Sequence, residues 1–229
     1  MASTIQIISS MATRQLLADL VARFEGAHPG WQIRVESVGG VDAAKRVQAD
    51  EAFDVVVLAS DAIDKLIAAG KVLAPRRDVV SSSVAVAVKA GTPWPDISSE
   101  AALKQAVLAA PTLSYSTGPS GVQLAKLFER WGIADEIRPR IVQAPPGVPV
   151  GSLVTKGDVA LGFQQLSEMM NLPGIDVIGP LPEAVQITTI FSAAVAATCV
   201  DPAALQPLLA DWVSAETAQL KRDNGMAPA

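Results

Sequence analysis

Strand-like and helix-like patterns alternate along this chain from its first residues, and that alternation limits the folds open to it. Residues 4–9 form a short segment with β-branched side chains, which is typical of a strand. Residues 13–24 place apolar side chains at helical spacing. The pattern continues with strands at 31–38 and 54–58 and with helices at 41–49 and 61–69. A repeated strand–helix–strand order predicts an α/β fold whose parallel strands are joined by right-handed crossovers.

A second α/β series follows after the polar break at residues 76–78. It predicts strands at 79–89, 112–116, 140–143, 159–163, 176–178 and 187–197, and helices at 99–108, 121–131, 148–156, 202–213 and 215–223, with a further helix starting at Gln164. The two long Val-rich strands, 79–89 and 187–197, are natural crossings between domains. We therefore predict two lobes, one formed by residues 1–81 plus 189–229 and the other inserted at 82–188. Each lobe is expected to be a mostly parallel sheet flanked by helices, with a ligand cleft between the lobes.

The junctions where a strand ends and a helix begins are the candidate ligand-binding positions. Ligands of open α/β sheets bind outside the carboxyl ends of the strands. Helix N-termini offer unpaired N–H groups and a partial positive charge, so they attract anions without any lysine. Arg14, one turn from the first junction, could reach a carboxylate. The candidate set is Ser9, Ser10, Met11, Arg14, Gly39, Gly40, Val41, Ser120, Gly121, Gly147, Val148, Gln164 and Gln165.

Composition excludes several classes of function. The net charge is −5 and no basic run is present, which argues against nucleic acid as a partner. The sequence contains no stretch of about 20 uncharged apolar residues, so we expect no membrane insertion. The chain has one cysteine, Cys199, and one histidine, His28, so we expect no metal site and no histidine-based catalysis. Neither a Walker A motif nor GxGxxG is present, and no cofactor is expected.

The same junctions carry a resemblance to a known family. The segments concerned are Ile7-Ile-Ser-Ser-Met-Ala-Thr13, Asp54-Val-Val-Val-Leu-Ala-Ser-Asp61, Thr117-Gly-Pro-Ser-Gly121 before Leu127-Phe-Glu-Arg-Trp-Gly132, and Leu161-Gly-Phe-Gln-Gln-Leu-Ser167. Over nearly its whole length the chain resembles the molybdate-binding branch of the periplasmic solute-binding proteins. The resemblance implies a two-lobed periplasmic-binding-protein-like fold, a small anion as ligand, and the membrane subunits of an ABC-type importer as partners.

The chain also departs from that family. Molybdate binders have hydroxyl-bearing residues after the first two strands and a tyrosine after a strand of the second lobe. Here Ser9 and Ser10 occupy the first place, Gly39 and Gly40 the second, and Gln165 the tyrosine place. Ser120 and Gly147 fall where the family offers backbone amides. The glutamine and Arg14 suit an organic di- or tricarboxylate at least as well as an oxyanion.

Two other functions stay open at this point. Enzymes that isomerise aconitate are similar to this family and would use the same cleft, but no proton-transfer residue stands out at the junctions. A sensor or transcription module is a third possibility, although the chain shows neither a DNA-binding nor a membrane part. The protein is expected to be periplasmic if a signal peptide was removed before Met1, and cytoplasmic if this is the full native chain.

Overall fold

The computed structural model describes residues 4–144 and 148–229. The chain divides into two compact units, the first containing residues 1–82 and 190–229 and the second residues 83–189. Two strands, β4 (Arg77–Lys89) and β8 (Thr188–Val195), run from one unit into the other. Within the described ranges no helix is long and apolar enough to cross a membrane.

The sheet of unit 1 is built from the N-terminal βα repeats. Its strands are β1 (Ile5–Ser10), β2 (Ile33–Val38) and β3 (Val55–Ala59), ordered β2-β1-β3 and followed by β8. β1 pairs in parallel with both β2 and β3, whereas β8 is antiparallel to β3. All five residues of β3 are buried, as its unbroken apolar sequence predicts.

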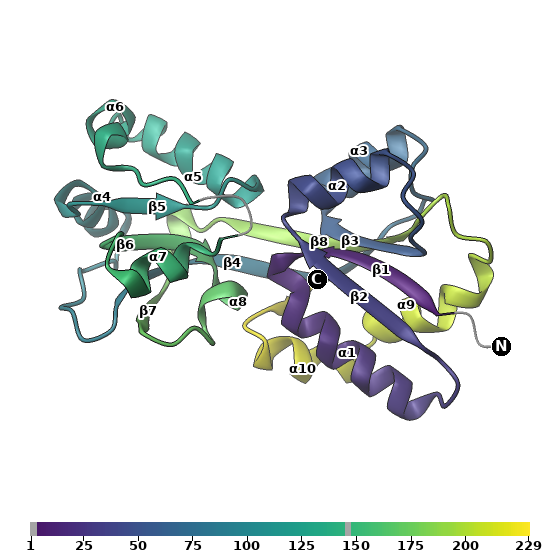
Figure 1. The fold of residues 1–229 in the computed structure, drawn as a ribbon. Coiled ribbons are helices and arrows are strands. Elements are labelled where there is room, and N and C mark those ends of the chain that lie inside the picture. Colours follow the sequence, from purple (N-terminus) through teal and green to yellow (C-terminus); the bar gives the residue numbers. More distant parts are fainter. Residues whose placement is uncertain (1–3, 145–147) are drawn as a thin grey trace. The chain divides into compact units, whose positions relative to one another are not determined.

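Helices cover both faces of this sheet (Figure 1). They are α1 (Arg14–Ala27), α2 (Gly40–Gln48), α3 (Ser60–Ala68), α9 (Gln206–Trp212) and α10 (Ala218–Asp223). Alternate residues of β3 point to opposite faces, so Val57 packs with α1 and α9 while Leu58 packs with α2 and α3. The C-terminal helices therefore complete the core of unit 1.

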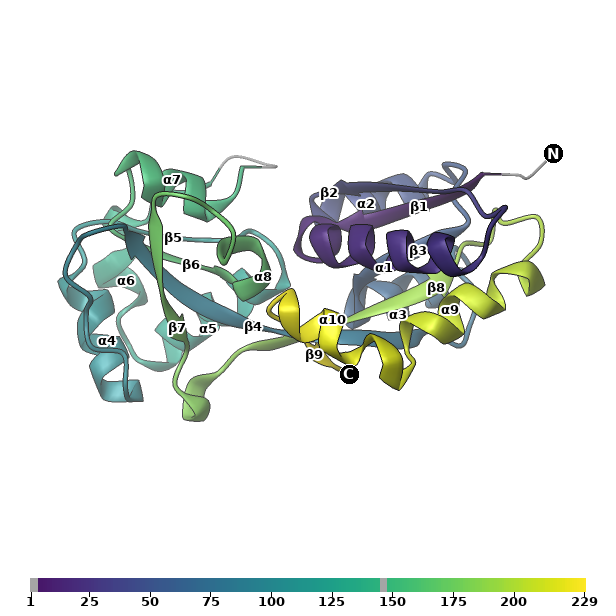
Figure 2. The same cartoon turned by 90° about the horizontal axis from the view of Figure 1, so that it is seen from below.

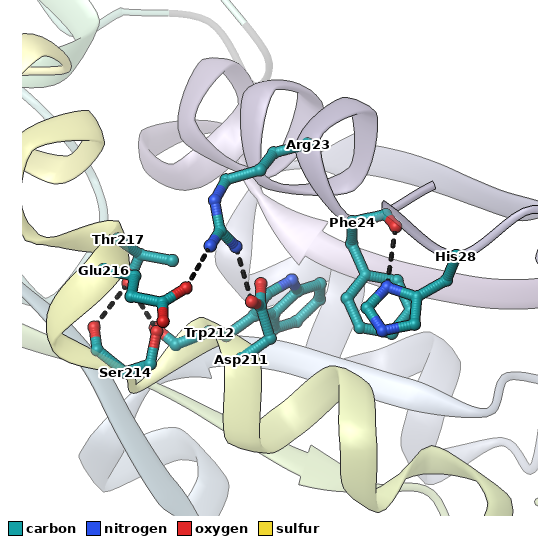
Figure 3. A network of polar contacts seen from close by, with 8 residues as sticks. All are labelled: Arg23, Phe24, His28, Asp211, Trp212, Ser214, Glu216 and Thr217. Atoms are coloured by element: carbon teal, nitrogen blue, oxygen red, sulfur yellow. Dashed lines mark hydrogen bonds and ion pairs between the residues drawn. The ribbon is translucent and has the colours of Figure 1, made fainter. Parts of the chain in front are cut away.

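A polar network joins the C-terminal segment to α1 (Figure 3). Arg23 of α1 donates from Nη1 to Asp211 Oδ1 at 2.5 Å and from Nη2 to Glu216 Oε2 at 2.8 Å. Beside this pair, Trp212 is fully buried in the unit 1 core. His28, the exposed C-cap residue of α1, donates from Nδ1 to the Phe24 carbonyl oxygen at 2.9 Å and stacks on the Phe24 ring.

Unit 2 contains a mixed sheet. β5 (Leu113–Tyr115) and β6 (Leu161–Gln165) pair in parallel, while β4 is antiparallel to β6 and to β7 (Ile175–Pro180). The α/β class is confirmed, but this sheet contains more antiparallel pairing than the sequence led us to expect. Helical and strand periodicity reveal the elements and not their direction, and β4 enters unit 2 as a continuous strand without a crossover helix.

The helices of unit 2 also lie on both faces of its sheet (Figures 1 and 2). They are α4 (Glu100–Ala109), α5 (Pro119–Arg130), α6 (Ala134–Ile137), α7 (Val150–Lys156) and α8 (Leu166–Met169). On β4, Val84, Val86 and Val88 pack with α4 and α5, whereas Ala85 and Ala87 pack with α7. A two-residue strand, β9 (Ala227–Pro228), pairs with β4 within unit 1.

Three local predictions were wrong. Residues 140–143 do not form a strand, because Pro139 lies in a 3₁₀ turn and only Ile141 bridges to Leu113. No helix starts at Gln164, since β6 pairs with β4 through Gln165 and α8 begins after it. The helix expected from residue 61 begins at Ser60 instead, and Ala59 holds its cap position.

Candidate functional site

In unit 1, the carboxyl end of β1 presents a buried hydroxyl group with no partner. Ser10 is the last residue of β1, pairs with Val38 of β2, and is only 8% exposed. Its Oγ makes no hydrogen bond within the described part of the chain. The neighbouring Ser9 differs, because its Oγ is 2.7 Å from Ser37 Oγ. A buried hydroxyl is usually hydrogen-bonded, so the unpaired Ser10 group is available to a ligand.

The start of α2 lies next to Ser10. A Cβ atom built on Gly40 would lie 3.7 Å from Ser10 Cβ, so the helix begins within van der Waals distance of the hydroxyl-bearing side chain. Gly39 is the N-cap residue and makes no side-chain cap. The first N–H groups of a helix have no partner inside the helix. Ser10 and the Gly40–Val41 backbone together form an anion-accepting edge without a lysine.

The other predicted residues of this region are close in sequence to Ser10 or to Gly40. Met11 opens a 3₁₀ turn (Met11–Thr13) between β1 and α1, and Thr13 Oγ1 donates to the Ser10 carbonyl oxygen at 3.1 Å. Arg14 is exposed and forms no ion pair with a described residue. Val41 is 52% exposed. Ligand binding by Arg14 stays a prediction.

In unit 2, the start of α5 is packed against the turn that precedes it. Ser120 is buried and its Oγ lies 3.1 Å from Ser116 Oγ. A Cβ atom on Gly121 would come within 1.6 Å of the Ser116 carbonyl oxygen. Only glycine permits this close backbone approach. Gly121 therefore has a packing reason for its identity, and Ser120 has a partner of its own.

Gln165 presents a second unpaired polar atom. It ends β6, is 3% exposed, and donates from Nε2 to Thr189 Oγ1 at 2.8 Å. Its Oε1 is buried and makes no hydrogen bond in the described chain. The Gln165 amide has two N–H donors, and the Thr189 contact uses one of them. The predicted position is therefore polar and buried, and it is already partly engaged.

Gln164 belongs to a different group, which includes an acid that sequence reasoning missed. Gln164 Oε1 accepts from the Val150 N–H at 2.9 Å, at the start of α7, and Gln164 Nε2 donates to Glu168 Oε2 at 2.6 Å. Burial raises the pKa of Glu168 to about 7, and the hydrogen bond from Gln164 opposes that shift only in part. Glu168 remains partly exposed by surface area. The signal in the sequence was weak, since an acid in a short helix is ordinary.

Two remaining predictions concern the loop before α7. Gly147 lies outside the described residues. Val148 packs against the core that includes Val150 and Val154. Cys199 is half-buried beside the core of unit 1.

A cavity of about 400 Å³ lies elsewhere in unit 2. Its lining is mostly apolar and comes from the end of β4, the end of α4 and the start of β6, with Lys89, Ala110 and Leu161 among the residues. None of the predicted ligand-binding residues lines it. Among the described residues, no group of three or more His, Cys, Asp or Glu side chains could hold a metal ion.

The chain matches a family described as bacterial extracellular solute-binding protein over residues 5–227. It belongs to this family. Among its relatives, an aconitate isomerase from Pseudomonas sp. is 34% identical over 233 residues, covering 99% of this chain and 88% of the relative. The resemblance drawn from the junction segments is thereby confirmed at the level of the family.

Solved structures of two-lobed binding proteins share the fold. The periplasmic molybdate-binding protein of Azotobacter vinelandii superposes with a TM-score of 0.79 at 16% identity, covering 97% of this chain and 98% of that one. A tungstate ABC transporter structure from Geobacter sulfurreducens gives 0.74 at 18% identity, covering 96% and 98%. The sulfate-binding protein of Mycobacterium tuberculosis gives 0.80 at 14% identity, covering 99% and 87%. At these identities the likeness establishes the fold alone.

Proposed function

We propose that this solute-binding protein binds a small organic di- or tricarboxylate. One observation carries the proposal: the buried Ser10 hydroxyl, unpaired among the described residues, lies beside the start of α2. The first N–H groups of a helix have no partner inside the helix. A hydroxyl donor and helix N-terminal amides stabilise negative charge and offer nothing comparable to a cation. The ligand is therefore an anion.

Three features favour a carboxylate over a tetrahedral oxyanion. Gly40 brings no second hydroxyl to the unit 1 edge, and Gln165 stands where molybdate binders have a tyrosine. The exposed Arg14 has the planar donor geometry that pairs with a carboxylate through two hydrogen bonds. The 34%-identical relative is an aconitate isomerase, and the name of that enzyme refers to a tricarboxylate. Molybdate is accordingly not the best ligand.

The family supports a role in uptake. The structural relatives include binding components of ABC transporters, and the family is described as extracellular. We propose that the protein works outside the cytoplasmic membrane and delivers its ligand to the membrane subunits of an ABC importer. In unit 1, we propose that Ser10 and Arg14 take part in binding.

A thermal-shift screen of oxyanions, di- and tricarboxylates, neutral sugars and amines tests this function. A ligand at 100 times its dissociation constant adds about 2.7 kcal/mol to the free energy of unfolding, which gives a clear rise in melting temperature. We expect the largest rise with a di- or tricarboxylate. A rise with sugars or amines and none with anions would refute anion binding.

A second candidate function is isomerisation of an unsaturated tricarboxylate. The identity of 34% over 99% of the chain to an aconitate isomerase favours it. Such a reaction needs a group that moves a proton at a carbon next to a carboxylate. The acid Glu168 meets that chemical requirement. Conversion of cis- to trans-aconitate, followed by proton NMR, tests this candidate separately from binding.

A further inference from the structure

An acidic side chain in unit 2 is held in a state suited to proton transfer. Glu168 follows β6 by three residues and lies in α8, which packs against β6 and β7. One of its carboxyl oxygens, Oε2, accepts from Gln164 Nε2 at 2.6 Å. Gln164 is itself fixed by the Val150 N–H, which its Oε1 accepts at 2.9 Å. The backbone of α7 therefore orients the amide, and the amide orients one oxygen of the acid.

The second oxygen of Glu168 makes no hydrogen bond within the described residues, and the side chain is partly exposed. One oxygen is thus anchored while the other can reach a molecule outside the core. Gln165, the next residue along β6 from Gln164, ends the same strand with its own buried and unpaired Oε1. Successive strand residues point to opposite faces, so Gln164 and Glu168 lie on the α7 side of β6, whereas Gln165 pairs with Val84 and points to the α5 side.

No nearby charge explains the state of this acid. On the strands that pack against α8, the charged residue is Asp176 of β7, which accepts from the Gly91 N–H at 3.0 Å. Lys156 lies in the last turn of α7, at the opposite end of that helix from Val150. Burial is the largest cause of the raised pKa of Glu168, about 7, and the Gln164 hydrogen bond lowers it. A general base or acid works best with a pKa near the working pH.

We propose that Glu168 is the proton-transfer residue of an allylic isomerisation carried out by this protein, with Gln164 as its positioning residue. This inference rests on the second candidate function above. The ionised Glu168 carboxylate removes a proton from the methylene carbon next to a carboxylate of the substrate, and that C–H bond breaks. The electron pair forms a new double bond to the central carbon, and the original double bond opens. The distal carbon then takes a proton from Glu168, so the double bond has moved by one carbon and no other reactant is needed.

The test uses the full chain with cis- and trans-aconitate in D₂O. Proton NMR follows both isomerisation and exchange of the methylene protons, and calorimetry measures affinity. We expect Glu168→Gln to bind with a dissociation constant within about threefold of the parent and to lose at least about 100-fold in rate, the lower end of what a general base contributes. Glu168→Asp should retain part of the activity. Glu183→Gln, which removes an exposed acid from the same unit, should leave the rate unchanged.

The parent protein gives a readout that does not depend on whether the variants fold. Its kcat/KM should rise with pH through about 7, because the base must be ionised. If the parent isomerises aconitate and Glu168→Gln does so equally fast, Glu168 is not the base although the enzyme function stands. If the parent binds carboxylates but neither isomerises nor exchanges protons, both this inference and the second candidate function fail while the binding function survives.

Discussion

The candidate positions in the two units differ in how far their polar groups are already paired. In unit 1, the Ser10 hydroxyl makes no hydrogen bond to a described residue, and the neighbouring helix α2 has no side-chain cap bond at its start. In unit 2, the side chains bind one another: Ser120 with Ser116, Gln165 with Thr189, and Gln164 with Glu168. The unit 1 position thus keeps an unpaired hydroxyl, whereas the unit 2 positions form hydrogen-bonded contacts that include an acid.

The two glycine junctions should respond most differently to the same substitution. Gly121→Ala places a Cβ atom 1.6 Å from a backbone oxygen, so we expect a loss of at least about 3 kcal/mol in the free energy of unfolding. Gly40→Ala meets only Ser10 Cβ at 3.7 Å, an ordinary contact, and should change stability by less than about 1 kcal/mol. Denaturant unfolding of both variants checks this. Equal stability losses would show that the two junctions are not packed as described.

The acid of unit 2 should make stability depend on pH. The pKa of Glu168 is about 7 in the fold against a usual 4.5, so the folded state holds the proton more tightly. The contribution of Glu168 to the free energy of unfolding is therefore fully present below about pH 4.5. It is lost as the pH rises through about 7. Each pKa unit corresponds to 1.36 kcal/mol, so Glu168→Gln should be more stable than the parent at pH 8 by up to about 3 kcal/mol.

That gain should vanish at pH 4.5, where the parent side chain is also neutral. Glu183→Gln is the matched control, since an exposed acid should show little effect at either pH. Melting temperatures measured from pH 4.5 to 8.5 provide the comparison. A constant difference between Glu168→Gln and the parent across that range would contradict the assignment of the raised pKa.

The sequence predicted unit 1 better than unit 2. The alternation of apolar residues located the parallel strands and the junction at Ser10, because local periodicity determines which face of each element is buried. It could not show that β4 pairs antiparallel with β6, since strand direction is a property of the whole chain. It also passed over Glu168, whose burial depends on contacts with α7 and β6 that form only in the folded unit.

Arg14 should have the smallest effect on the fold and a selective effect on binding. Its side chain is exposed, so Arg14→Ala should leave the melting temperature of the free protein within about 1 °C, as surface substitutions usually do. If Arg14 pairs with a carboxylate of the ligand, the variant should bind carboxylates about tenfold more weakly than the parent. Calorimetry with a tricarboxylate and with sulfate distinguishes the cases. Equal losses for both anions would remove Arg14 as the residue that selects carboxylates.

We propose that the unpaired hydroxyl of unit 1 binds a carboxylate ligand, and calorimetric titration of the parent and of Ser10→Ala with trans-aconitate is the sharpest test. Losing one hydrogen bond to a charged ligand should cost about 1.5 to 3 kcal/mol, so we expect saturable binding that weakens about 10- to 100-fold in the variant. The melting temperature of the free variant should not fall, because no partner is lost inside the protein. Unchanged affinity in Ser10→Ala, or tight molybdate binding by a parent that does not bind carboxylates, would contradict the claim.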